Sequence, residues 1–179
     1  MDVLCNEMQR CAFRTFKGKF VKHNNIFNVP FGTSKSTIAS ILFQPWTWTF
    51  FPKARHLTGT YTEPLGLDLA NKSLEVIKSD KYMRCFPHVK IVISSASHFT
   101  NSLGGERRIC TVGGKSPLGF HAHFLGCDDP IDPKGAVSQS ELDNAFCFSR
   151  NLSSKIRFIS LGKSRSVTEI LTLTSDLLS

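Results

Sequence analysis

The stretch Asn25–Trp48 constrains the fold of this chain more than any other part of its sequence. A short β-prone run, Asn25–Val29, enters a turn, and an apolar run with helical spacing begins directly after Lys35-Ser36-Thr37. This order of strand, tight loop, lysine, hydroxyl and helix is typical of a phosphate-binding loop, because loop N–H groups and the helix N-terminus donate to an anion. The stretch therefore predicts a phosphate site at the end of a strand.

The usual sequence of such a loop is G-x-x-x-x-G-K-[ST], and this chain keeps only part of it. Val29 and Ser34 stand at the two glycine positions, whereas Gly32, Lys35 and Ser36 support the pattern. In this interpretation Lys35 contacts the β- and γ-phosphates of a nucleotide, and the Ser36 hydroxyl binds Mg²⁺. The alternative interpretation is an ordinary strand–turn–helix unit in which a serine caps the helix.

A second polar cluster follows a later strand. The buried-looking run Ala122–Cys127 ends abruptly at Asp128 and Asp129. Ligands of open α/β sheets bind at the carboxyl edge of the strands, so Asp128 is expected to hold Mg²⁺ beside the Ser36 hydroxyl. Asp129 is then placed to orient or deprotonate an attacking water. An isolated Asp-Asp-Pro sequence favours a surface turn instead, but its occurrence together with the Lys-Ser-Thr loop favours a nucleotide site.

The remaining pattern predicts an α/β fold with a largely parallel sheet flanked by helices, because strand-like and helix-like runs alternate. Pro45 is expected to end or kink the helix after the loop near Gln44. The composition changes after about residue 145, which divides the chain into a domain over 1–145 and a divergent tail over 146–179. The expected helices are Met1–Lys19, Ser36–Thr49 and Glu63–Asp80, and the expected strands are Asn25–Val29, Arg55–Tyr61, Val89–Ile93, Arg107–Val112 and Ala122–Cys127.

Charge and cysteine usage narrow the class of protein further. The 179 residues carry a net charge of +8, which suits a nucleotide or nucleic-acid partner but also fits simple solubility. The six cysteines are scattered without a C-x-x-C pair, as in a reduced intracellular protein. No run reaches the ~18 apolar residues of a membrane span, so no membrane partner is expected.

Two further side-chain groups leave alternatives open. His121 and His123 share a face if they lie on a strand, and with Cys127 and Asp128 they suggest a transition-metal site, although no further ligand cluster completes it. The basic residues Arg107, Arg108 and Lys115 are candidates for phosphate or DNA contacts, or belong to a solvated face.

At this level of detail the chain resembles the ATPase domain of tailed-phage terminase large subunits, the motors that package viral DNA. Three segments carry the resemblance, VPFGTSKSTIASILFQPW, LTGTYTEPLGLDLANKSLEVIKSDKY and TVGGKSPLGFHAHFLGCDDPIDPKGAVSQSEL, within the range Met1–Asn144. It implies that Asp128 is the Mg²⁺ aspartate and that Asp129, glutamate in many relatives, is catalytic together with Lys35. The implied nucleotide-binding residues are Pro30, Phe31, Gly32, Thr33, Ser34, Lys35, Ser36 and Thr37.

The resemblance also implies an activity and partners. These are Mg²⁺-dependent ATP hydrolysis that drives double-stranded DNA into a procapsid, a homo-oligomeric ring, a portal protein and a terminase small subunit. The implied location is the cytoplasm of the bacterial host, transiently at the procapsid portal and not in the mature virion. The alternatives are a non-catalytic remnant that binds nucleotide or DNA weakly, or serves only as an interaction surface, and a basic DNA-binding module without a nucleotide role.

Several parts of that family have no match in this chain. The adenine-recognition segment and the nuclease domain are not found, and no convincing coupling-motif strand occurs within Phe146–Ser179. We therefore expect a P-loop NTPase-type sheet that is incomplete on its C-terminal side, from a truncated gene product. In this hypothesis the tail is out of frame or poorly ordered.

Overall fold

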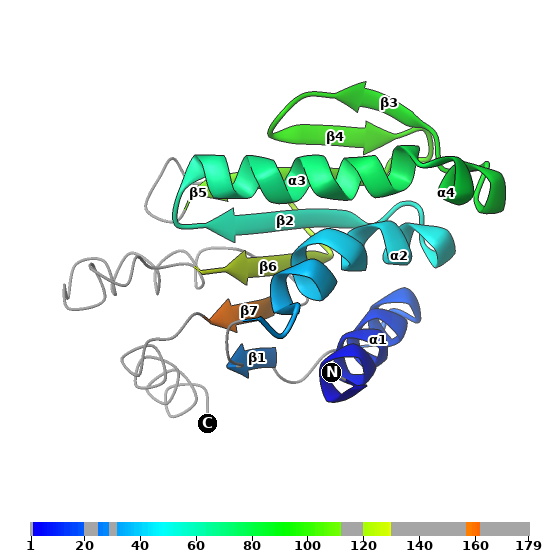
Figure 1. The fold of residues 1–179 in the computed structure, drawn as a ribbon. Coiled ribbons are helices and arrows are strands. Elements are labelled where there is room, and N and C mark those ends of the chain that lie inside the picture. Colours follow the sequence, from blue (N-terminus) through cyan, green and yellow to red (C-terminus); the bar gives the residue numbers. More distant parts are fainter. Residues whose placement is uncertain (1, 20–24, 29–31, 112–119, 130–156, 162–179) are drawn as a thin grey trace.

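A seven-stranded sheet organises the chain. The computed structural model describes residues 2–19, 25–28, 32–111, 120–129 and 157–161 (Figure 1). The strands are β1 (Asn25–Asn28), β2 (Arg55–Thr60), β3 (Ile91–Ser94), β4 (His98–Asn101), β5 (Glu106–Thr111), β6 (Phe124–Asp128) and β7 (Arg157–Leu161). Their order across the sheet is β1-β7-β6-β2-β5-β4-β3. In this order, β1, β7, β6, β2 and β5 are parallel to one another, whereas β4 is antiparallel to both of its neighbours. The predicted α/β fold with a largely parallel sheet is therefore confirmed.

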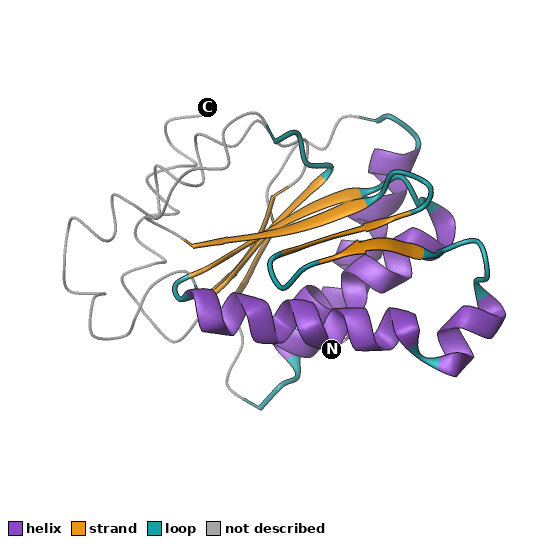
Figure 2. Cartoon of the chain, turned by 90° about the horizontal axis from the view of Figure 1, so that it is seen from above, coloured by secondary structure: helices purple, strands orange, loops and turns teal. Residues whose placement is uncertain are grey.

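The described helices are α1 (Asp2–Phe16), the π-helix η1 (Thr37–Leu42), α2 (Phe43–Phe50), α3 (Glu63–Lys78) and α4 (Asp80–Cys85). Helix α3 runs along one face of the sheet (Figure 2). Its Gly66 allows this close approach, because a Cβ there would lie 2.8 Å from Thr60 Oγ1 and collide with the side chain of Ile109. No helix among the described residues is long and apolar enough to span a membrane.

The helix after the loop runs past Pro45, so one of the two outcomes expected there, an end of the helix, is wrong. It does not end near Gln44, because the π-helical turns of η1 pass directly into α2, which contains Pro45 and continues to Phe50. A proline has no N–H for the carbonyls four and five residues earlier, which here belong to Ile41 and Ser40. The Ser40 carbonyl accepts a hydrogen bond from Arg107 Nη2 at 2.8 Å, so a side chain from β5 satisfies it. The buried proline is therefore tolerated inside the helix.

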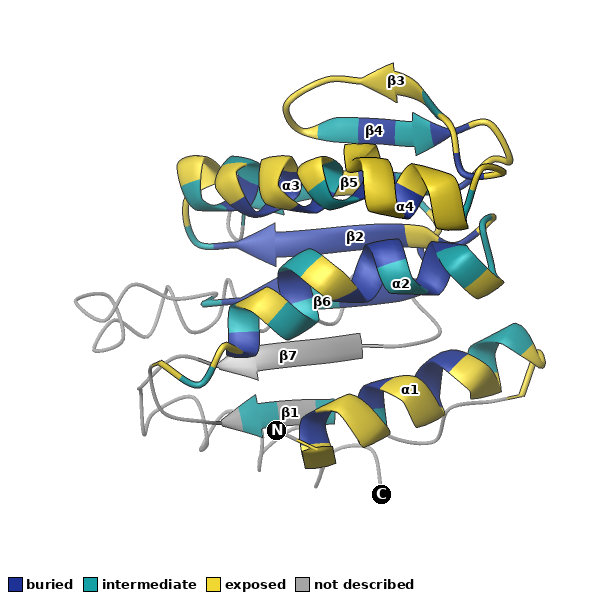
Figure 3. Cartoon of the chain, turned by 45° about the vertical axis from the view of Figure 1, so that its right-hand side comes forward, coloured by how far each residue is buried: buried dark blue, intermediate teal, exposed yellow. Residues whose placement is uncertain are grey.

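The core lies between α1, α2, α3 and one face of the sheet. Trp48 is fully buried and donates its Nε1–H to the Ala54 carbonyl at 3.0 Å. Phe43 packs edge-to-face on Phe124 of β6 at a centroid distance of 5.2 Å, which joins the helix after the loop to the strand that carries the two aspartates. Figure 3 shows β2 buried along most of its length and α1 buried on one side only.

Three elements were not predicted from the sequence. Helix α4 and strand β4 are short, at 6 and 4 residues, and are stabilised by their neighbours rather than by their own periodicity. Strand β7 lies within the tail 146–179, yet it pairs in parallel with β1 on one side and β6 on the other. A run of only five residues such as Arg157–Leu161 gives no periodicity signal of its own. Its place in the sheet is decided by strands far away in the sequence.

A buried histidine lies beneath α2. The His56 ring stacks on Phe124 at 4.8 Å, and its Nε2 lies 2.8 Å from Thr47 Oγ1. Since Thr47 donates its own hydroxyl hydrogen to the Gln44 carbonyl, it must accept from His56, which fixes the neutral Nε2–H tautomer. Burial, then the nearby Arg107 and His123, hold the pKa of His56 well below its ordinary value of 6.5.

This histidine should make the fold acid-sensitive. Below pH 6.5 the unfolded chain binds a proton that the folded chain does not, so stability is complete above this pH and falls as the pH decreases toward the folded-state pKa. The expected slope is about 1.4 kcal/mol per pH unit for this one proton. Urea unfolding of wild type and His56→Gln between pH 7.5 and 5 measures it. The variant should lose that part of the slope, and an unchanged slope would contradict the assignment.

Candidate functional site

The carboxyl edge of the sheet brings together two segments that are far apart in sequence. The loop after β1 and the end of β6 meet where Lys35 Nζ lies 3.3 Å from Asp129 Oδ1, across 94 sequence positions. The Lys35 side chain is 9% exposed and that of Asp129 is 36% exposed, so the ion pair has one buried and one open side. The structure therefore juxtaposes the lysine of the loop and the second aspartate of the strand.

Asp128 lies deeper, at 1% exposure. Its Oδ2 accepts a hydrogen bond of 2.8 Å from Ser40 Oγ, whereas its Oδ1 is buried without a hydrogen-bond partner in the described part of the chain. A desolvated carboxylate oxygen without a donor is costly, and a bound cation would remove that cost. The donor set therefore fits a site in which Asp128 contributes one oxygen to Mg²⁺, which commonly takes its remaining ligands from phosphates and water.

The hydroxyl on Asp128 comes from Ser40, whereas the sequence pattern pointed to Ser36. Ser36 is half-buried at the start of η1, and its side chain does not cap the helix. Ser36 therefore does not act as the capping serine of the alternative strand–turn–helix interpretation. A role for Ser36 as a Mg²⁺ ligand stays a prediction, as does the contact of Thr37, the exposed first residue of η1.

The backbone of the site contains three left-handed residues. Gly32, Ser34 and Asp129 have φ values of +77°, +55° and +44°. Glycine adopts this conformation without penalty, whereas each L residue costs on the order of 1 kcal/mol. Ser34 stands at the second glycine position of the loop pattern, so its conformation shows what a glycine there would supply. The strain is concentrated at the residues next to Lys35 and Asp128.

Arg107 is a further residue of the site that the sequence did not reveal as such. The sequence placed it among possible phosphate or DNA contacts or on a solvated face, but it is 1% exposed and not available to an external ligand. Its Nη2 donates to the Ser40 carbonyl, and Ser40 Oγ donates to Asp128. Burial lowers the pKa of Arg107 to about 10, so its guanidinium remains charged at neutral pH. Ser40 thus links a buried cation to the buried carboxylate.

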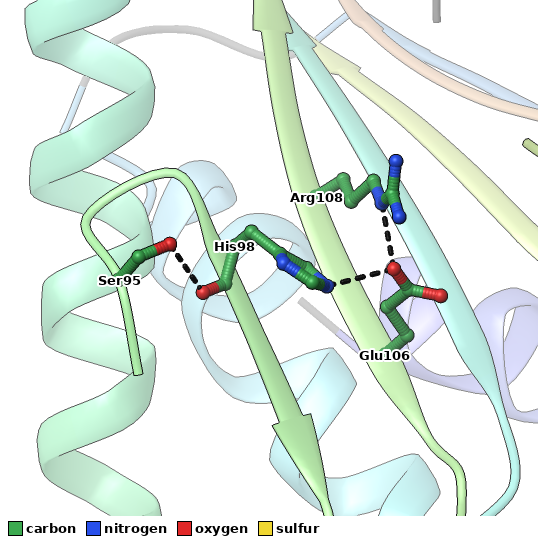
Figure 4. A network of polar contacts seen from close by, with 4 residues as sticks. All are labelled: Ser95, His98, Glu106 and Arg108. Carbon is green, nitrogen blue, oxygen red and sulfur yellow. Dashed lines mark hydrogen bonds and ion pairs between the residues drawn. The ribbon is translucent and has the colours of Figure 1, made fainter. Parts of the chain in front are cut away.

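Arg108, the neighbouring candidate, has a structural role (Figure 4). Its Nε lies 2.6 Å from Glu106 Oε1, which also contacts His98 Nε2 at 2.7 Å. Its guanidinium lies 4.8 Å from the centre of the Phe120 ring. The shared carboxylate joins β4 to β5, and Ser95 Oγ closes the β3–β4 turn on the His98 carbonyl at 2.7 Å. Lys115, Pro30 and Phe31 lie outside the described residues.

The proposed transition-metal cluster is not formed among the described residues. Strand β6 begins at Phe124, so His121 and His123 precede it rather than share a strand face. His121 is exposed, and His123 Nδ1 accepts a hydrogen bond of 3.0 Å from the Arg55 backbone. His123 and Asp128 lie at opposite ends of the strand.

These features define a class of fold, an open α/β sheet with a lysine-bearing loop after an edge strand and two carboxylates at the end of a central strand. No protein-family model matches the chain, and no curated protein sequence matches it significantly. Among solved structures, the crystal structure of the HK97 bacteriophage large terminase matches with a TM-score of 0.60 and 10% sequence identity. The match covers 94% of this chain and 35% of that terminase, so this chain spans about a third of its length. The resemblance suggested by the sequence is therefore confirmed at the level of the fold.

Proposed function

We propose that this chain is a nucleotide-binding ATPase module of the kind found in phage DNA-packaging motors. The observation that carries the proposal is the meeting of Lys35 with Asp129, and of Ser40 with Asp128, at the carboxyl edge of a terminase-like sheet. A loop lysine beside two carboxylates supplies the groups that phosphoryl transfer from ATP requires, a cation for the phosphates and acids for the metal and the water. The reaction would be Mg²⁺-dependent hydrolysis of ATP.

Each residue has a defined part in this proposal. Lys35 binds the β- and γ-phosphates, with the backbone of Gly32–Ser34 as their cradle. Asp128 Oδ1 and the Ser36 hydroxyl would hold Mg²⁺, which would supply positive charge against the phosphate oxygens. Asp129 orients the attacking water and accepts its proton. Because Lys35 and Asp129 form an ion pair, nucleotide phosphates must compete for Lys35, and their binding releases the Asp129 carboxylate for the water.

The partners and location follow from the proposed class of motor. Hydrolysis would drive double-stranded DNA into a procapsid, in a ring of several copies that contacts a portal protein and a terminase small subunit. The protein would act in the cytoplasm of a bacterial host, transiently at the portal. The fold likeness supports this part of the proposal, together with the net charge of +8.

The second candidate function is a non-catalytic remnant that binds nucleotide or DNA weakly. Three observations favour it: the loop lacks both glycines of the usual pattern, Lys35 is already neutralised by Asp129, and Ser34 is strained. A remnant would bind nucleotide without releasing phosphate, whereas an active module releases phosphate in proportion to protein concentration.

Substitution of Lys35 tests the nucleotide site directly. We expect Lys35→Ala to weaken Mg²⁺–ATP binding by about ten- to a hundred-fold, since a charged hydrogen bond to phosphate contributes about 1.5–3 kcal/mol. Titration with a fluorescent ATP analogue, with Mg²⁺ and with EDTA, measures the change. Lys72→Ala is the matched control, because Lys72 is an exposed lysine on α3 paired with Asp68. Equal affinities for wild type and Lys35→Ala would refute the site.

A further inference from the structure

The end of the sheet opposite the candidate nucleotide site is rich in positive charge. The parallel strands begin there, and Figure 1 shows the C-terminal ends of α1 and α2 and the helix α4 gathered at the same end. This surface, which we call the basic edge, combines exposed cationic side chains from five separate segments. Its members are Lys17, Lys19, Lys53, Arg55, Lys78, Lys81, Arg84 and Lys90.

Direct contacts hold the segments of the basic edge together. The Phe16 and Phe51 rings pack at 5.1 Å, which places the end of α1 beside the α2–β2 turn that contains Lys53. Asn101 Nδ2 donates to the Pro52 carbonyl at 2.7 Å, and the next residue along, Ser102, donates its N–H to the Lys90 carbonyl at 2.8 Å. These hydrogen bonds therefore connect the segments that carry Lys53 and Lys90 through the end of β4.

The charges of the basic edge are not neutralised locally. Lys53, Arg55 and Lys90 are exposed, and none of them forms an ion pair within the described part of the chain. The acid at the start of β5, Glu106, is already engaged by His98 and Arg108 (Figure 4). The acid on α4, Asp80, lies within the first turn of that helix, where it complements the helix dipole.

Helix dipoles alone do not explain the basic edge. Lysines in the last turn of a helix, such as Lys78 of α3, are a common complement to the helix C-terminus. Lys53 and Lys90, however, lie beyond the last turns of α2 and α4, in the segments that lead into β2 and β3. Both segments expose a lysine side chain whose hydrating water can be replaced by a phosphate group.

The geometry of the basic edge points to a linear polyanion. Arg55 begins β2 and Lys90 precedes β3, and these strands are three positions apart in the sheet order. Three strand spacings correspond to about 14 Å. Cations spread over this length match the phosphates of a nucleic-acid duplex, which present one charge per ≈ 1.7 Å of axis, better than a single compact anion.

We propose that the basic edge is a docking surface for the phosphate backbone of double-stranded DNA. The choice of DNA as the polyanion rests on the proposed function, but binding at this edge needs neither ATP nor the residues of the nucleotide site. The basic edge and the nucleotide site lie at opposite ends of strands of five or six residues, about 17–20 Å apart. DNA and nucleotide can therefore be bound at the same time. Phosphate contacts of this kind give affinity without base-sequence preference.

The test compares two double variants with the same change in net charge. Lys53→Gln/Lys90→Gln removes two cations of the basic edge, whereas Arg10→Gln/Lys72→Gln removes two exposed cations that are paired with Glu7 and Asp68. Binding of a fluorescently labelled 30-base-pair duplex of mixed sequence is measured by anisotropy between 50 and 300 mM salt. Thermal unfolding of each variant confirms that it is folded.

The basic-edge variant should bind the duplex on the order of ten-fold more weakly per lost contact at 50 mM salt. The slope of log affinity against log salt concentration should become shallower by about two. The control variant should change far less. Equal losses in both variants, or no measurable duplex binding by wild type, would overturn the proposal. Preferential binding to anionic phospholipid vesicles over the duplex would also overturn it. Lys35→Ala should bind DNA as wild type does, so failure of the nucleotide site and failure of this surface are distinguishable.

Discussion

Asp128→Asn should abolish the dependence of nucleotide binding on Mg²⁺ and reduce ATP turnover by about 10² to 10³-fold. The carboxylate is buried, and its Oδ1 is the one described polar atom at this edge that lacks a donor and carries negative charge. An asparagine retains an oxygen for the Ser40 hydroxyl but removes the charge that a cation requires. Nucleotide affinity in Mg²⁺ should therefore fall to the value measured in EDTA.

The same substitution should leave the fold intact or stabilise it. Removing a buried, partly unsatisfied charge relieves its desolvation cost. The free energy of unfolding should therefore fall by no more than about 1 kcal/mol, or rise. Asp68→Asn, on the exposed side of α3, is the matched control for loss of one negative charge. If Asp128→Asn unfolds the protein, or if its Mg²⁺ dependence equals that of wild type, the metal role is wrong.

Arg107→Ala should lower the free energy of unfolding by about 2–4 kcal/mol, because it leaves a cavity and an unpaired Ser40 carbonyl in the core. The guanidinium itself is not a net source of stability. Burial lowers its pKa from 12.5 to about 10. A shift of this size corresponds to a cost of about 3 kcal/mol for keeping the charged form inside the protein. Well below pH 10 the group is protonated in both folded and unfolded chains, so this cost is constant at physiological pH.

Arg107→Met separates the volume of Arg107 from its charge. Methionine fills much of the space without the desolvation cost. The free energy of unfolding of Arg107→Met should therefore lie within about 1 kcal/mol of the wild-type value. Methionine cannot donate to the Ser40 carbonyl, so the hydroxyl on Asp128 loses its support and Mg²⁺ affinity should fall while stability is retained. Urea unfolding and Mg²⁺ titration of both variants measure these effects. Equal destabilisation by Ala and Met would contradict the argument, as would Mg²⁺ affinity unchanged in Arg107→Met.

The local chemistry of the site was predictable from the sequence. The Lys-Ser-Thr run before an apolar helix and the Asp-Asp pair after an apolar strand are both read within a few residues, because strand, turn and helix signals are short-range. The fold class follows from their alternation. The roles of Lys35, Ser36, Asp128 and Asp129 stay predictions until nucleotide binding is measured.

The positions of Ser40, Arg107 and β7 could not be predicted. Ser40 has no signal beyond its place one helical turn after Ser36, and Arg107 stands in a strand next to a second arginine of similar pattern. Which of the two arginines is buried depends on which face of β5 the helices cover. The insertion of β7 between β1 and β6 depends on pairing with two strands that lie far from it in the chain.

The sequence by itself determined the elements and the chemical groups: a loop with one lysine, a strand with two terminal carboxylates, and a basic chain. Only the tertiary structure decided which groups meet, because the contacts of Lys35 with Asp129 and of Ser40 with Asp128 span 94 and 88 positions. It also placed Asp128 and Asp129 at one edge of the sheet and the residues of the basic edge at the other. Strand order sets both outcomes, since a parallel sheet aligns all strand ends of one kind at a single edge.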